Sequence, residues 1–201
     1  MILVVTATLE AEAMECIDRA RLLQNQTVAP LRTSEFLEME VPERSREAGW
    51  DEVAIAVEDN QARAALWRHA DSIGLLARSL IHPSSMISPS ASIGPGSVVL
   101  ARAVVNASGI LGRGCILGSS SSVDHDCVLG DYVHLYPGVS LGGLVNIGRF
   151  ATLHESAFVL PTVTIGEGAR VGVRAVVLKH VPAHVFVSGI PARRSQATQP
   201  I

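Results

Sequence analysis

The sequence predicts a mainly β protein, a parallel β-helix preceded by a small α/β domain, in a chain of 201 residues. The composition is 48% hydrophobic but only 4% aromatic, so small and aliphatic side chains must fill the core. Aliphatic residues also recur at every sixth position from Ile87 to Val177. A six-residue period is typical of a β-helix in which three short sides close one coil.

The first segment, residues 1–81, alternates between strand and helix patterns. We expect strands at 2–5, near Val28 and at 53–57, and helices at 9–23 and 61–70. Strands that alternate with helices favour a parallel sheet. Residues 1–81 are therefore predicted to form a small α/β domain of the Rossmann-like type.

The β-helix is expected over residues 82–181. Its aliphatic column is Ile87, Ile93, Val99, Val105, Leu111, Leu117, Val123, Leu129, Leu135, Leu141, Ile147, Leu153, Val159, Ile165, Val171 and Val177. A small or slim residue stands four positions after most of these, and turns are expected two and three positions after each one. Residues 182–201 form a tail whose last residues are expected to fray.

Charge and composition exclude several classes of partner. The net charge of −3 and the pI near 6.1 do not favour nucleic acid or an anionic membrane. No apolar run reaches the roughly 18 residues of a membrane span, and the first residues lack the pattern of a signal peptide. Cys16, Cys115 and Cys127 form no metal or disulfide motif, so a cytoplasmic protein is expected.

Polar residues that the repeat does not require are the candidate functional residues. His125 and Asp126 occupy one corner of a coil, and Gly143 occupies the same corner one coil later. His134 lies between two inward residues and should point outward on the opposite side, about 17 Å from that corner if each side follows strand dimensions. One chain cannot bring His125 and His134 to one substrate, but neighbouring chains of a cyclic homotrimer can.

The stretch S-S-V-D-H-D-C-V-L-G-D-Y-V-H-L-Y-P-G, residues 121–138, resembles a signature of bacterial sugar acetyltransferases. The similarity is to the sialic-acid O-acetyltransferase and UDP-4-amino-sugar N-acetyltransferase family of the left-handed β-helix superfamily. H-P-S at His82, V-L-P at Val159 and G-I-P-A-R at Gly189 extend it. The resemblance implies a left-handed helix and an acetyl-CoA-dependent or acyl-CoA-dependent N- or O-acyltransferase that acts on a small-molecule acceptor without a metal.

The resemblance also implies roles for individual residues. His125 matches the general base, Asp126 its acidic neighbour, and His134 the second histidine of the cleft, which also contacts the substrate. Gly143 matches a glycine whose N–H faces the thioester. Position in the chain, and not the resemblance, makes Lys179, Arg193 and Arg194 candidate partners for the CoA phosphates.

Departures from the family pattern leave the acceptor open. Glu10 stands where the first turn of the family has a histidine after glycines, and Glu58 replaces a later glycine. Gly118 occupies a substrate-facing position that usually holds asparagine. The acceptor is accordingly a sugar or nucleotide sugar, or else a non-sugar amine or hydroxyl compound. The alternatives are an inactive scaffold and a zinc-dependent carbonic anhydrase, whose histidine spacing this chain lacks.

Overall fold

The computed structural model describes residues 2–6, 28–32 and 52–195. The N-terminal part is a parallel sheet of β1 (Ile2–Thr6), β2 (Val28–Arg32), β3 (Glu52–Ala56) and β4 (Leu76–Ala77) in the order β2-β1-β3-β4. Helix α4 (Asn60–Ser72) connects β3 to β4. These elements confirm the predicted strands and the second helix. The helix predicted at 9–23 lies outside the described residues, so the Rossmann-like assignment remains a prediction.

Helix α4 begins where Asp59 caps it, because the Asp59 carboxylate accepts a 2.7 Å hydrogen bond from the Ala62 N–H. Its buried face holds Trp67, which is fully buried against the first coils. A Cβ on Gly96 would lie 2.3 Å from the Trp67 ring, and one on Gly114 would lie 3.2 Å from its indole nitrogen. Because glycine has no Cβ, these two positions leave room for the indole. Both glycines also have a positive φ, which favours glycine.

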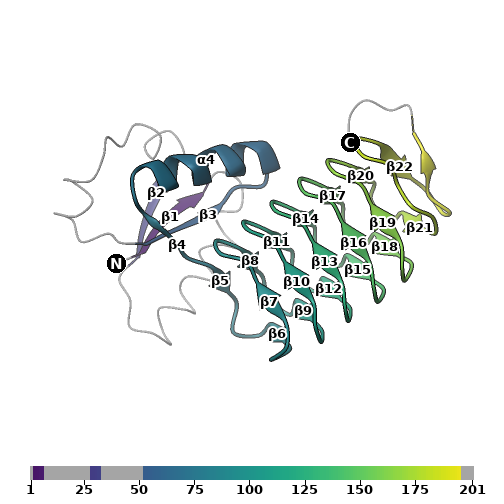
Figure 1. Cartoon of the computed structure of the whole chain (residues 1–201), viewed down its shortest axis with the longest axis horizontal. Helices are drawn as coiled ribbons and strands as arrows, with labels where there is room; N and C mark the ends of the chain where they lie inside the picture. Colours follow the sequence, from purple (N-terminus) through teal and green to yellow (C-terminus); the bar gives the residue numbers. More distant parts are fainter. Residues whose placement is uncertain (1, 7–27, 33–51, 196–201) are drawn as a thin grey trace.

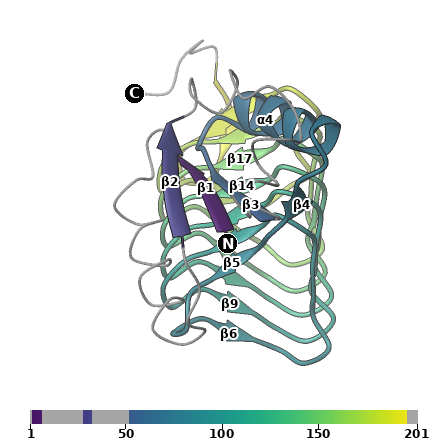
Figure 2. The ribbon, with the colours of Figure 1, turned by 90° about the vertical axis from the view of Figure 1, so that its left-hand side faces the viewer.

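Residues 80–188 form a parallel β-solenoid (Figure 1). Three sheets run along it, and Figure 2 shows its stacked coils obliquely from the N-terminal end. The β14 sheet contains β5 (Leu80–Ile81), β8 (Val98–Val99), β11 (Ile116–Leu117), β14 (His134–Leu135), β17 (Thr152–Leu153), β20 (Arg170–Val171), β22 (Phe186–Ser188) and β23 (Arg193–Arg194). The β15 sheet contains β6 (Met86–Ile87), β9 (Val104–Val105), β12 (Ser122–Val123), β15 (Ser140–Leu141), β18 (Phe158–Val159) and β21 (Val176–Val177). The β13 sheet contains β7 (Ser92–Ile93), β10 (Ile110–Leu111), β13 (Val128–Leu129), β16 (Asn146–Ile147) and β19 (Thr164–Ile165).

The pairing register confirms the predicted coil. Leu111 pairs with Leu129, and Leu129 pairs with Ile147, so each strand pairs with the strand 18 positions later. The aliphatic column and the small residues four positions later fill one continuous core, in which Cys115 and Cys127 are buried. Side chains with rings do not fit inside these coils, which accounts for the low aromatic content.

Most corners contain a residue in the left-handed region, three positions after the aliphatic residue. Asp126 has φ 56° and Leu144 has φ 64°. The predicted corner positions are therefore confirmed, and they place His125 and Asp126 between β12 and β13. That corner is opposite the β14 sheet, because the strands of the three sheets follow one another in a fixed order.

Pairing extends beyond the expected limits of the repeat at both ends. β5 pairs with β8, and β22 pairs with β20 at a spacing of 16 residues rather than 18. β23 then returns antiparallel to β22, so part of the expected tail is ordered against the coil. No helix in the described ranges is both long and apolar enough to cross a membrane.

Candidate active site

The corner between β12 and β13 presents His125 and Asp126 to solvent. The Asp126 carboxylate lies 2.8 Å from Nδ1 of His125, and about half of each side chain is exposed. The pKa of His125 is raised, first by this hydrogen bond and then by the charge of Asp124. Since a carboxylate only accepts, Nδ1 donates and Nε2 is left as the basic nitrogen. The pair therefore has the form of an oriented general base.

Gly143, one coil later, lies directly against that basic nitrogen. A Cβ built on Gly143 would lie 2.5 Å from Nε2 of His125, so the ring rests where any other residue would place its side chain. Several equivalent corner positions hold proline, namely Pro89, Pro95, Pro137 and Pro161. Proline has no N–H, so the ladder does not need a donor at this position. The Gly143 N–H is therefore available to a ligand beside His125.

The same corner continues through Pro161 to Lys179, three coils from His125, or roughly 14 Å at the usual strand separation. Here a cavity of about 440 Å³ opens at the last coil. Lys179, Arg193 and Arg194 all line it and all are exposed. The structure thus brings together the three cationic residues that the sequence assigned to one ligand.

His134 points away from the coil interior, as predicted, but the N-terminal part of the same chain covers it. It is 2% exposed, its Nδ1 lies 3.3 Å from the Glu58 carbonyl oxygen, and its ring stacks on Tyr136 at 4.1 Å. Burial, followed by the nearby charge of Arg63, lowers its pKa to about 3. His134 is therefore a neutral imidazole on the β14 sheet, and one chain does not bring it together with His125.

Arg63, a residue that the sequence did not single out, fixes the segment over His134. Its guanidinium is fully buried and donates to the carbonyls of Val57 and Glu58 in the covering segment. It also donates to the carbonyls of Gly114 and Tyr132 in the coils. A lone arginine on an amphipathic helix is usually solvated, so no sequence signal distinguished it.

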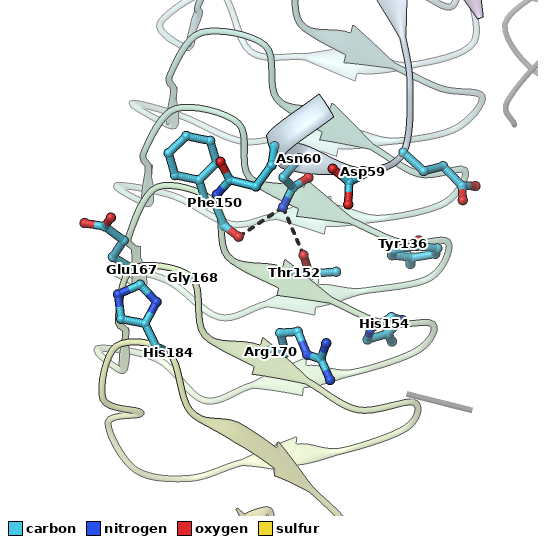
Figure 3. A pocket seen from close by; sticks show the side chains of 12 residues that line it. Asp59, Asn60, Tyr136, Phe150, Thr152, His154, Glu167, Gly168, Arg170 and His184 are labelled. Atoms are coloured by element: carbon cyan, nitrogen blue, oxygen red, sulfur yellow. Dashed lines mark hydrogen bonds between the residues drawn. The ribbon is translucent and has the colours of Figure 1, made fainter. Parts of the chain in front are cut away.

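Asn60, at the start of α4, attaches the same segment one coil later. Its Nδ2 donates at 3.0 Å to the Phe150 carbonyl and at 3.0 Å to Thr152 Oγ1 (Figure 3). Beyond this attachment a second cavity of about 440 Å³ opens over the β14 sheet. Its lining includes Glu58, which departs from the family pattern in the sequence, together with Tyr136, His154 and Arg170.

Gly118 offers no side chain to a substrate and has no room for one. It is buried, and a Cβ would lie 2.5 Å from the backbone nitrogen of Pro137. Its predicted contact with substrate remains a prediction. Within the part of the chain that the structure describes, no three His, Cys, Asp or Glu side chains gather in a group that could hold a metal ion.

Solved structures of similar proteins identify the family. PerB from Caulobacter crescentus, solved in complex with CoA and GDP-perosamine, is 33% identical, covers 97% of both chains and has a TM-score of 0.86. The acetyltransferase domain of PglB from Neisseria gonorrhoeae, in complex with acetyl coenzyme A, is 28% identical with a TM-score of 0.84, over 96% of this chain and 98% of that one. The chain belongs to the hexapeptide-repeat, left-handed β-helix acetyltransferases.

Curated sequences match over a shorter region. Serine acetyltransferase from Bacillus pumilus is 38% identical over 84 residues, which is 38% of this chain and 39% of that protein. The chain thus matches well under half the length of this relative. The match supports the presence of the repeat, and it does not indicate serine as the substrate. A scan against protein-family models finds no match.

Proposed function

We propose that this protein transfers an acetyl or related acyl group from acyl-CoA to the nitrogen or oxygen of a small-molecule acceptor. One observation carries the proposal. At the corner between β12 and β13, Asp126 orients His125, and Nε2 of His125 packs against Gly143, which has no side chain. The structural relatives support it, because PerB and PglB were solved with CoA or acetyl-CoA.

The residues of the corner fit an acyl-CoA. Lys179, Arg193 and Arg194 would hold its phosphates, and the column between them and Gly143 has a length that a pantetheine arm can follow. When bound, the thioester supplies an activated carbonyl carbon and a sulfur leaving group. Gly143 allows close approach, and its N–H would donate to the oxygen on which negative charge develops.

His125 performs the proton transfer in this proposal. Its Nε2 accepts the proton of the attacking amine or hydroxyl as the new C–N or C–O bond forms. The same proton is then donated to the sulfur as the C–S bond breaks, so the products are the acylated acceptor and the free thiol. Asp126 keeps Nδ1 protonated and stabilises the imidazolium between the two steps.

The proposed cleft lies between subunits of a homotrimer. His125 lies at the corner opposite the β14 sheet, whereas His134 and Tyr136 lie on that sheet beside the N-terminal part. In a cyclic assembly the corner of one subunit faces the β14 sheet of the next. Tyr136, on which the buried and neutral His134 stacks, would then form part of the acceptor wall.

Thiol release from acetyl-CoA tests the function against nucleotide-linked amino sugars, free amino sugars and non-sugar amines. We expect turnover that His125→Ala reduces by about 100-fold or more, since a general base contributes 10²–10⁴-fold. Ser108→Asn, at the same corner one coil earlier, is the matched control and should retain activity. Thiol release that is insensitive to His125→Ala would refute the mechanism, and no thiol release with any acceptor would favour the inactive scaffold.

Sedimentation of the purified chain tests the assembly. An active monomer would refute the intersubunit cleft, because one chain places His125 and His134 on opposite sides of the coil.

Among acceptors, sugars and nucleotide sugars are the first candidates because the structural relatives include a GDP-perosamine complex. A non-sugar amine or hydroxyl compound is the alternative, favoured by the Glu58 carboxylate that lines the cavity beside Tyr136.

A further inference from the structure

The cavity over the β14 sheet lies beside the start of α4, and we name it the Arg170 pocket. Its floor is formed by Thr152 and Arg170, which are outward residues of β17 and β20. The start of α4 closes one end through Asp59 and Asn60 (Figure 3). Its volume of about 440 Å³ is that of a site for a small molecule.

At one end of the Arg170 pocket, the Glu58 carboxylate lies beside the rings of Tyr136 and His154. Glu58 and Tyr136 line it together, and the pKa of Tyr136 is raised to about 12, first by burial and then by the Glu58 charge. His154 stacks on the other face of this wall, 4.9 Å from the Tyr136 ring. A carboxylate here can accept hydrogen bonds from an amine or a hydroxyl group.

The floor of the pocket carries the Arg170 guanidinium. Arg170 is half-buried, and its guanidinium lies 5.3 Å from the centre of the Phe186 ring. Among the described residues, no carboxylate pairs with it and no acceptor takes its hydrogen bonds. Glu167, which also lines the pocket, is instead held by Arg149 at 3.0 Å.

Two histidines flank Arg170 in the pocket, and burial lowers the pKa of His154, so that ring is neutral at pH 7. Figure 3 shows Arg170 extending across the floor between His154 and His184. The His184 ring is seated against Gly168, where a Cβ would lie 2.6 Å from its Nδ1. An arginine stacked on a ring with free N–H groups is well suited to hold a carboxylate or a phosphate by paired hydrogen bonds.

We infer that the acceptor of the acyl transfer carries an anionic group, a carboxylate or a phosphate monoester, which Arg170 binds. Its amine or hydroxyl end lies at Glu58 and Tyr136. This inference rests on the proposed function, because Tyr136 is next to His134 on the wall that would face the His125 corner of the neighbouring subunit. The pocket thus orients the acceptor, with its anion on the floor and its nucleophile toward the cleft.

Matched acceptor probes test the inference with the full-length chain. Glucosamine is the neutral-ring probe, glucosamine 6-phosphate adds a phosphate, and 2-amino-2-deoxyglucuronic acid adds a carboxylate to the same amine. Binding is measured by calorimetry and turnover by thiol release from acetyl-CoA. The variants are Arg170→Gln and Arg170→Lys, with Arg68→Gln, on the exposed face of α4, as the matched control.

We expect at least one anionic probe to bind about tenfold or more tightly than glucosamine, as a charge-assisted pair would provide. Arg170→Gln should remove that preference and raise KM for the anionic probe, with kcat and the KM for acetyl-CoA unchanged. Arg170→Lys should restore part of it, and Arg68→Gln should behave as the wild type. Comparison of the phosphate and carboxylate probes identifies the anion.

Two other results overturn the inference. The first is equal binding of the charged and neutral probes, or binding of neither, and the second is a preference that survives Arg170→Gln. Failure of the proposed function looks different, because thiol release would then be absent or insensitive to His125→Ala whatever the acceptor. His125-dependent turnover without an anion preference would therefore reject the acceptor class and leave the acyltransferase proposal standing.

Discussion

Gly143→Ala should separate activity from stability. The new Cβ would lie 2.5 Å from Nε2 of His125, whereas ordinary contacts begin near 3.4 Å, so the ring must move by about 1 Å. The ring is about half exposed, so it can swing outward at little cost to the fold. Gly143 is not among the residues with positive φ, so alanine fits the backbone.

The expected loss follows from that displacement. A misplacement of about 1 Å in a catalytic group can cost about 100-fold in rate, which corresponds to about 2.7 kcal/mol of activation free energy. Replacing glycine by alanine at a compatible position changes the free energy of unfolding by about 0.4–1 kcal/mol in the stabilising direction. We therefore expect kcat to fall about 100-fold while Tm stays the same or rises.

Thiol release and thermal unfolding measure the two quantities, and a double-mutant cycle shows the cause. If Gly143→Ala acts by displacing His125, it should have little further effect in a His125→Ala background. A kcat within twofold of wild type would refute the reasoning. An equal 100-fold loss in the His125→Ala background would show that Gly143 acts on the thioester and not through His125.

Three further changes test other parts of the structure. Asp126→Asn removes the main cause of the raised pKa of His125, so the acidic limb of the kcat/KM profile should move to lower pH, because the base is active only when deprotonated; an unmoved limb would contradict the assignment. His134→Phe should flatten the pH dependence of the unfolding free energy between about pH 6.5 and pH 3. In that range only the unfolded wild-type chain protonates this histidine, so the wild-type protein loses up to about 1.4 kcal/mol of stability for each unit by which the pH is lowered. Equal slopes for the two proteins in denaturant titrations would count against a depressed pKa. Ser121→Ala should leave the free energy of unfolding unchanged or raise it by about 1 kcal/mol, because the buried Ser121 hydroxyl has no described hydrogen-bond partner; a clear loss in denaturant unfolding would reveal one.

The sequence was sufficient to predict the coil and its corners because that information is local. The six-residue period determines which side chains point inward, and a fixed coil length places His125, Asp126 and Gly143 on one corner. Pairing at 18 positions and the left-handed residues at most corners agree with those expectations. The close contact between His125 and Gly143 follows from stacking alone.

The acceptor side of the site could not be predicted because it depends on how the N-terminal part docks onto the coils. The cover over His134 is held by hydrogen bonds from Arg63 and Asn60, which lie far in sequence from the coils they contact. An arginine or an asparagine in a helix does not by itself indicate a hydrogen bond to a distant part of the chain. Arg170 was missed for a related reason, since an outward arginine in one hexad is usually a solvated charge.

The last coil determines how the solenoid ends. Val181 bridges to β19, and the Val176 backbone exchanges hydrogen bonds with Gly189 and Ala192 at the margin of the β15 sheet. β23 lies along β22 in the opposite direction, which breaks the parallel pattern. A stack of identical coils otherwise presents a template to which another copy could add end to end. The short final coil and its antiparallel return thus occupy the strand edges at this end of the stack, where a second copy would otherwise pair.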